Sequence, residues 1–222
     1  FPAVPKRDFV KHHGNDRVKL LFVGSGQNPG VGDFHSRGGK EVVKMFTLLD
    51  REYHNKIELV LRAKLPPELK SEIRRYRNIK LIENVVPRNA LEQEFKSSDV
   101  LINPAHTHLN TIVIDAMSYG LPVIATDIYN YREWIEDGIN GFLIEPPKGI
   151  PYFWRNFIPS GPSPARPVFD RGLKSLQWST VKQLVEKVRV LIEDEGLRKS
   201  ISIAARREVE EGRFSIQRRN AK

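Results

Sequence analysis

The feature that most constrains the fold is a regular alternation of short apolar, β-branched runs with longer segments of helical pattern, beginning at Val18. Such alternation is typical of repeated β–α–β units, which build a parallel sheet. We therefore predict an α/β fold, a doubly wound parallel sheet with helices on both faces. Strands are expected at 18–23, 57–62, 79–83, 100–103, 123–126 and 141–144, with helices at 39–52, 67–77, 89–97, 111–119 and, shorter, 131–137.

The length of 222 residues allows one large domain or two small ones, since a domain usually takes about 100–200 residues. We expect one domain over 18–222, because a chain this long buries about 70–75% of its unfolded surface without help from a disulfide or metal. The sequence has no cysteine, which excludes thiol nucleophiles, thiolate metal sites and disulfides. We accordingly expect a cytoplasmic location. No segment approaches the ~18–20 apolar residues of a membrane span, so the chain should be soluble.

Two parts of the chain interrupt the alternation or follow it. Between residues 145 and 177, seven prolines forbid a continuous helix or central strand, and five aromatic residues argue against disorder. Two interpretations stay open for this irregular segment: an ordered cover on the domain, or a surface that meets a partner lobe. Beyond it, apolar residues at helical spacing over 181–192 predict a packed helix, with Ser179 as its N-cap and Trp178 as a packing residue beneath it.

The net charge of +9 would attract phosphates, acidic lipids or nucleic acid alike. We interpret the arginine runs at 74–77, 206–207 and 218–219 as solvated helix faces. A nucleic-acid-binding protein stays an alternative because of the charge. The chain lacks the aromatic signatures and zinc-ligand spacings of such proteins, so we expect no nucleic-acid partner.

The first predicted strand is followed by a glycine-rich loop. Glycines allow backbone N–H groups to approach an anion, the start of the next helix adds a positive dipole end, and Arg37 and Lys40 supply full charges. The loop therefore indicates a diphosphate site, although a flexible turn would look the same. The third glycine of the dinucleotide-binding fingerprint is missing at its usual offset. The loop runs from Gly24 and Ser25 to Gly32, and Arg37, Gly38, Gly39 and Lys40 follow it.

A second polar loop follows the strand at 100–103, and a helix is expected to begin near Asn110 or Thr111. The free N–H groups of that helix would point at whatever the loop holds, and phosphate would fit there. Ligands of doubly wound sheets bind at the carboxyl ends of the strands, where both loops lie. His106 and His108 could suggest a metal, but no third ligand is spaced to join them. We expect no metal, and we place the two histidines near a phosphate.

The segment from Thr107 to Thr126 resembles the Glu-x7-Glu donor-site block of retaining, two-lobed (GT-B) glycosyltransferases of the glycogen-synthase and mannosyltransferase type, the glycosyl transferases group 1. Residues 133–143 and 212–215 are also similar to that family. The resemblance covers nearly the whole chain from Val18 onward, except the proline-rich segment. It implies a Rossmann-like domain that forms one lobe of a GT-B fold.

The resemblance also implies roles for single residues. Asp115 takes the place of the second Glu and would accept hydrogen bonds from the ribose hydroxyls of the donor. Thr107 takes the catalytic position of the first Glu, but a neutral hydroxyl cannot stabilise positive charge on the sugar. The backbone amides that meet sugar and phosphate fall on Leu109, Asn110 and Thr111, beside His108, and the loop at 84–88, with Val86 and Arg88, would lie against the nucleobase.

The resemblance further implies two basic residues for the donor diphosphate. Arg37 matches the family's lysine before Gly-Gly. The second basic residue, directly after the first glycine Gly24, is here Ser25. Lys40, Arg62 or Lys64 could supply that charge instead, and all three stay open.

The implied enzyme moves a sugar from a nucleotide-diphosphate sugar to an acceptor hydroxyl with retention, and it needs no cofactor besides this substrate. The chain would be the donor-binding lobe, and residues 1–17 would be the linker from an N-terminal acceptor lobe that is not part of it. We expect the isolated lobe to bind nucleotide but to transfer little sugar. Peripheral membrane association of the whole enzyme stays open. So does a nucleotide-binding module without catalytic activity, because of Thr107.

Overall fold

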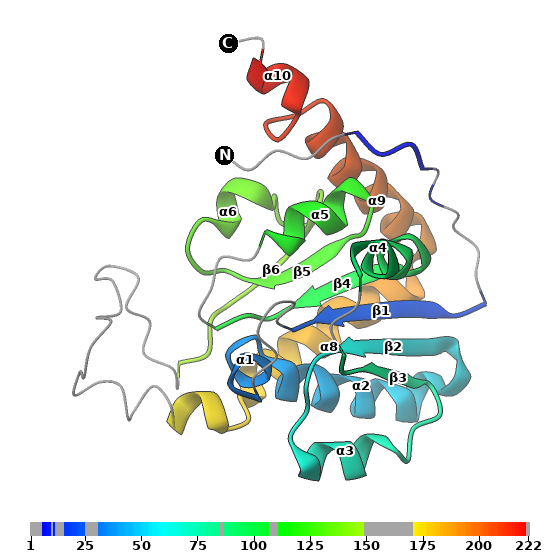
Figure 1. Cartoon of the computed structure of the whole chain (residues 1–222), viewed down its shortest axis with the longest axis vertical. Coiled ribbons are helices and arrows are strands. Elements are labelled where there is room, and N and C mark those ends of the chain that lie inside the picture. The colour runs from blue at the N-terminus through cyan, green and yellow to red at the C-terminus, as the bar shows by residue number, and fades with distance from the viewer. Residues whose placement is uncertain are drawn as a thin grey trace.

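The computed structural model describes residues 6–9, 11, 16–24, 31–84, 87–106, 111–148 and 171–220, with the backbone alone for residues 31–33 and 219. Six strands form one parallel sheet in the order β3-β2-β1-β4-β5-β6 (Figure 1). This confirms the predicted doubly wound fold, with every strand within one residue of its expected bounds. The strands are β1 (Val18–Val23), β2 (Ile57–Arg62), β3 (Ile79–Ile82), β4 (Val100–Asn103), β5 (Val123–Thr126) and β6 (Gly141–Ile144).

Helices connect the strands and follow the last one. Residues 171–174, inside the segment predicted to be irregular, also form a helical turn, while residues 149–170 of that segment lie outside the described part of the chain. The helices are α1 (Val31–Ser36), α2 (Gly39–Tyr53), the 3-10 turn η1 (His54–Lys56), α3 (Pro67–Ile73), α4 (Arg88–Ser97), α5 (Ile112–Ser118), α6 (Tyr131–Trp134), α8 (Trp178–Glu193), α9 (Glu195–Glu210) and α10 (Ile216–Asn220).

Two predicted helices are shorter than expected. Helix α3 ends at Ile73 instead of residue 77, and Tyr76 turns back to pack edge-on against Phe46 in the core, with ring centroids 6.5 Å apart. Helix α6 ends at Trp134 instead of residue 137, because the chain becomes extended at Ile135. In both places tertiary packing ends a helix that local sequence would continue.

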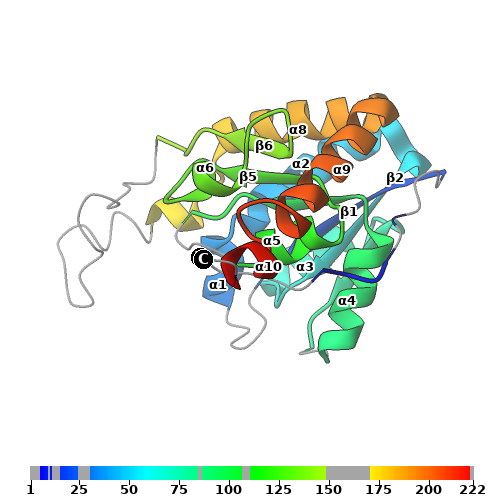
Figure 2. The same cartoon turned by 90° about the horizontal axis from the view of Figure 1, so that it is seen from above.

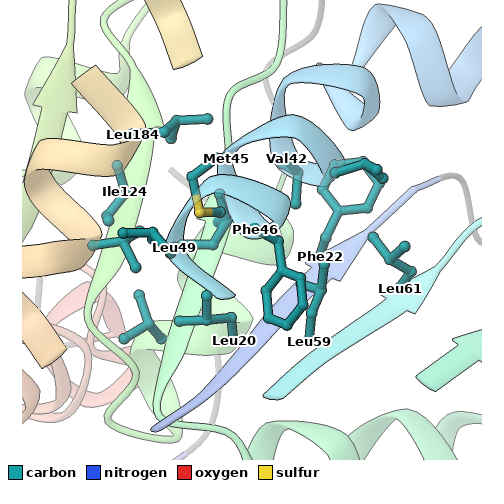
Figure 3. Packing of buried hydrophobic residues seen from close by; sticks show 14 of the residues in the cluster. Leu20, Phe22, Val42, Met45, Phe46, Leu49, Leu59, Leu61, Ile124 and Leu184 are labelled. Atoms are coloured by element: carbon teal, nitrogen blue, oxygen red, sulfur yellow. The ribbon is translucent and has the colours of Figure 1, made fainter. Parts of the chain in front are cut away.

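The sheet separates two apolar cores, because successive side chains of a strand point to opposite faces. One core contains Leu20, Phe22, Leu59 and Leu61 from the strands, packed against α2 and α8 (Figure 3). The other lies beneath α4, α5 and α6, and α9 contributes to both. Figure 2 shows α8 and α4 on opposite sides of the sheet. Both faces are therefore covered, as a purely parallel sheet requires.

The strand order reverses at β1, which lies between β2 and β4. All the strand arrows in Figure 1 point toward the side where α1 lies. The loops after β1 and β4 therefore start next to each other at one edge of the sheet, where ligands of doubly wound proteins bind. No helix of the described residues is long and apolar enough to cross a membrane.

Three expectations about surface and helix-end residues are wrong. Ser179 does not cap α8, because the helix starts at Trp178 and its N-cap is Gln177, without a side-chain hydrogen bond. Trp178 is 51% exposed, since it lies at the first position of the helix, with the Lys44 ammonium 5.3 Å from its ring centre. Arg206 is not a solvated residue: its guanidinium donates to the backbone carbonyls of Arg7 and Phe9. It thereby ties the N-terminal segment to α9.

Helix α9 has the side-chain cap that α8 lacks, and this difference is testable. The carboxylate of Asp194 accepts a hydrogen bond from the backbone N–H of Leu197 at 2.8 Å. We expect Asp194→Ala to lower the free energy of unfolding by about 1 kcal/mol, the usual cost of losing an N-cap. Ser179→Ala is the matched control and should change it by less than about 0.5 kcal/mol. Urea denaturation measures both, and equal effects of the two substitutions would contradict the assignment.

Candidate functional site

Gly24 directly follows β1, at the edge where the two loops start. Its backbone N–H donates to the carbonyl of Arg62 at 2.8 Å. A Cβ atom at this position would lie 2.9 Å from the Cβ of Ala63 and 3.2 Å from that carbonyl oxygen. Glycine therefore allows the chain that leaves β1 to run directly against the end of β2, and the glycine-rich loop begins there.

The connection between β1 and α2 packs against the connection between β4 and α5. Gly38 has a φ of +75°, and a Cβ atom there would lie 2.3 Å from the carbonyl oxygen of Pro104. Next to it, the backbone N–H of His106 donates to the carbonyl of Ser36 at 2.7 Å. The two predicted phosphate loops are therefore adjacent, and this contact sets where Arg37 lies relative to the start of α5.

A buried polar pair lies beneath this contact. His106 is 1% exposed, and its Nε2 is 3.5 Å from Oε2 of Glu41, which is 2% exposed. The other carboxylate oxygen of Glu41 accepts the backbone N–H of Gln177 at 2.9 Å. His106 is thus buried beside Glu41, and its expected place near a phosphate stays a prediction. The pair joins α2, the loop after β4 and the start of α8.

Basic side chains surround the same edge. Nε and one terminal nitrogen of Arg37 are buried, and neither has a hydrogen-bond partner among the described residues. The ammonium of Lys40 donates to the backbone carbonyl of Lys174. Arg88, the first residue of α4, is exposed, and its Nε lies 3.3 Å from a carboxylate oxygen of Glu92. Of these three residues, Arg37 alone has buried donor nitrogens without a partner among the described residues.

Asp115 lies in the first turn of α5, at the same edge, and its side chain is 33% exposed. Burial raises its pKa above the ordinary value, whereas the positive charges of Arg7 and Arg88 lower it and Glu92 raises it further. The guanidinium of Arg7 lies 3.5 Å from the carboxylate of Asp115 and 4.8 Å from the ring centre of Tyr119. A partly exposed carboxylate with a cation beside it can accept hydrogen bonds from ligand hydroxyls.

The sequence alone did not single out Arg7. It lies in the predicted linker, where it is one of nine charged or polar residues and belongs to no motif with a fixed spacing. Its place beside Asp115 depends on the bonds from Arg206 to the carbonyls of Arg7 and Phe9. Tertiary contacts with α9, and with α5 through the hydrogen bond from Arg7 Nε to the Ser118 hydroxyl at 3.3 Å, bring this segment to the site.

The structure places some of the predicted site residues and not others. Thr111 is the exposed N-cap residue of α5, in agreement with the predicted helix start. No three His, Cys, Asp or Glu side chains of the described residues gather to hold a metal ion. The donor-site positions Ser25, Val86, Thr107, His108, Leu109 and Asn110 lie outside the described residues.

The family described as glycosyl transferases group 1 has a model that matches residues 17–152 of this chain, more than half of its length. The matched part contains all six strands and both loops at their carboxyl edge. None of the curated proteins matches the chain.

Solved structures share the fold. WaaG, a glycosyltransferase involved in lipopolysaccharide biosynthesis, is 19% identical with a TM-score of 0.63, covering 94% of this chain and 46% of its own. The C-terminal domain of LpcC, a glycosyl transferase group 1 family protein from Francisella tularensis, is 18% identical with a TM-score of 0.63, covering 90% of this chain and 87% of its own.

A third similar structure contains a ligand. Anabaena HepE, solved in complex with UDP-glucose, is 17% identical with a TM-score of 0.61, covering 93% of this chain and 47% of its own. The chain therefore spans about half the length of WaaG and HepE, but most of the separate LpcC domain.

Proposed function

The chain belongs to the family of glycosyl transferases group 1, and from this premise we propose that it is the donor-binding lobe of a retaining glycosyltransferase. The lobe binds a nucleotide-diphosphate sugar. The bond between the anomeric carbon and the β-phosphate oxygen breaks, and its electron pair leaves with the diphosphate. A bond to an acceptor hydroxyl oxygen forms, and that hydroxyl gives up its proton. No further cofactor is required, because the donor carries the group that is transferred.

The observation that carries this proposal is the presence of a carboxylate and a guanidinium at the same edge of the sheet. Asp115 presents a partly exposed carboxylate in the first turn of α5, suited to the ribose hydroxyls. Arg37 presents buried nitrogens without a partner in the described part of the chain, suited to phosphate oxygens. A ligand with hydroxyls at one end and a diphosphate at the other satisfies both groups.

The proposed lobe is half of an enzyme. The longer proteins WaaG and HepE share its fold over only 46% and 47% of their chains. We propose that an N-terminal acceptor lobe supplies the remaining part of the active site. The isolated chain then binds the donor but transfers little sugar, because the acceptor hydroxyl has no group to hold it near the anomeric carbon.

The first test is a calorimetric titration of residues 1–222 with UDP, GDP and ADP. Because HepE was solved with UDP-glucose, UDP is the first ligand to try. We expect one of the three to bind more tightly than the others by at least about tenfold, about 1.4 kcal/mol. Absence of binding to all three would rule out the donor-binding role.

A nucleotide-binding module without catalytic activity is a second candidate, because Thr107 stands where the family has Glu. Both candidates bind nucleotide, so catalysis must be measured after an acceptor lobe is supplied. Transfer that appears with that lobe supports the enzyme. Binding without transfer, combined with transfer gained by Thr107→Glu, supports the module. A general affinity for nucleic acid would instead fall steeply with salt and show no preference among the three nucleotides.

A further inference from the structure

Arg62 is a charged residue in a position where the sheet is otherwise apolar. It is the last residue of β2 and is 5% exposed. It pairs with Val23 of β1 and Ile82 of β3, both of which belong to the core beneath α4 and α5. Paired residues of parallel strands point to the same face. The Arg62 side chain therefore lies on the α4 and α5 face, at the carboxyl edge.

The charge of Arg62 has no counter-charge in the described part of the chain. Its Nε is buried without a hydrogen-bond partner among those residues, and burial lowers the pKa of the guanidinium. Arginine nevertheless stays protonated in proteins, so the interior holds a cation. Arg198 is comparably buried, but its guanidinium donates to the backbone carbonyl of Leu191. Burying a charge is costly unless it is paired, so the position of Arg62 favours binding an external anion.

Lys40, Arg62 and Lys64 could each supply the positive charge that is missing at position 25, and their environments differ. The ammonium of Lys40 already donates to the carbonyl of Lys174. Lys64 is exposed, beyond the end of β2. Arg62 alone of the three is buried, and its backbone carbonyl accepts the N–H of Gly24, the residue before Ser25. This backbone contact places Arg62 next to the start of the glycine-rich loop.

We propose that Arg62 binds the diphosphate of the donor nucleotide, together with Arg37, and replaces the basic residue that the family has at position 25. This inference rests on the proposed donor-binding function and adds a residue to it. In this chain the positive charge lies at the end of β2, rather than in the loop after β1. Two arginines with buried nitrogens that lack a partner among the described residues then bind one ligand, Arg37 from the connection after α1 and Arg62 from the end of β2.

The test compares Arg62→Met, Arg62→Lys and, as the matched control, Lys64→Met. Each is titrated with whichever of UDP, GDP and ADP binds the unmodified chain most tightly, and with the corresponding nucleoside, followed by NMR chemical shifts. Because a hydrogen bond to a charged group is lost, we expect Arg62→Met to weaken binding of the nucleoside diphosphate by about 10- to 100-fold. Nucleoside affinity should change less than about threefold, since the nucleoside has no phosphate. Arg62→Lys should lie between, and Lys64→Met should match the unmodified chain.

A second measurement separates ligand binding from a structural role. Without ligand, Arg62→Met should melt at the same temperature as the unmodified chain or higher, because the substitution removes an unpaired buried charge. Inorganic pyrophosphate should raise the melting temperature of the unmodified chain and of Lys64→Met, but not of Arg62→Met.

Each contrary result has its own meaning. A lower melting temperature for unliganded Arg62→Met, or equal diphosphate affinities, would overturn the inference and leave the proposed function intact. Equal losses for diphosphate and nucleoside would do the same. If no diphosphate binds the unmodified chain, the proposed function fails, and the role of Arg62 fails with it.

Discussion

Asp115→Ala is expected to weaken binding of the nucleoside diphosphate by about 30- to 1,000-fold, or about 2–4 kcal/mol. The carboxylate is partly exposed in the first turn of α5, and we assign it two hydrogen bonds from the ribose hydroxyls. Hydrogen bonds to a charged group contribute about 1.5–3 kcal/mol each, and the two are not fully additive. Calorimetric titration of the variant measures the loss.

A ligand without the ribose hydroxyls tests whether those hydroxyls are the groups that Asp115 binds. The 2′,3′-dideoxy diphosphate should bind the unmodified chain about as weakly as the natural nucleotide binds Asp115→Ala, and the substitution should weaken it no further. If the two losses instead multiply, Asp115 does not contact the ribose. Glu92→Ala is the control. The Glu92 carboxylate also lies near the Arg7 guanidinium, at 3.9 Å, but it is not assigned to the ligand, so nucleotide binding should not change.

The protonation of the Asp115 carboxylate should make nucleotide binding depend on pH. Burial raises the pKa of Asp115, and a protonated carboxyl accepts hydrogen bonds poorly. Affinity should therefore be full above the raised pKa and fall as the pH decreases through it. Arg7 opposes the shift because its charge stabilises the carboxylate.

The strands of this fold could be predicted because their signal is local. Each is a short run of apolar and β-branched residues, and the burial patterns of β1 and β2, with five of six residues buried, match such runs. Helix ends were less predictable. The end of α3 depends on Tyr76 packing against Phe46, which is 30 positions earlier in the sequence. A pattern within a short window contains no information on that contact.

The residues of the candidate site also differ in how far the sequence alone could indicate them. Asp115 and Gly24 could be proposed from the sequence because they belong to motifs with fixed spacing. Arg7 could not, because its position depends on Arg206, almost 200 residues away in the sequence. Arg62 was one of three open candidates, and only the register of β2 against β1 and β3, with its burial, distinguishes it from Lys64. Sequence motifs thus lead to the proposed ligand, whereas tertiary contacts determine which charges lie at the candidate site.

Gly38→Ala is expected to lower the free energy of unfolding by about 2–5 kcal/mol, combining the cost of a left-handed backbone with that of overpacking. Gly38 has a φ of +75°, and the new Cβ atom would lie 2.3 Å from the carbonyl oxygen of Pro104 and 2.8 Å from its Cγ. Neither neighbour is the end of a flexible side chain. The connection between β1 and α2 must therefore move away from the loop after β4.

Gly138→Ala is the matched control for this effect. Gly138 has nearly the same backbone conformation, with a φ of +77°, but a Cβ atom there meets no described atom within 4 Å. Gly138→Ala should lower the free energy of unfolding by only roughly 1–2 kcal/mol, the cost of the left-handed conformation. Urea denaturation gives both values, and the difference between them measures the contact with Pro104 alone. Because that contact also sets where Arg37 lies relative to α5, Gly38→Ala should weaken diphosphate binding while Gly138→Ala leaves it unchanged. Equal stabilities of the two variants would show that the two loops are not held together here.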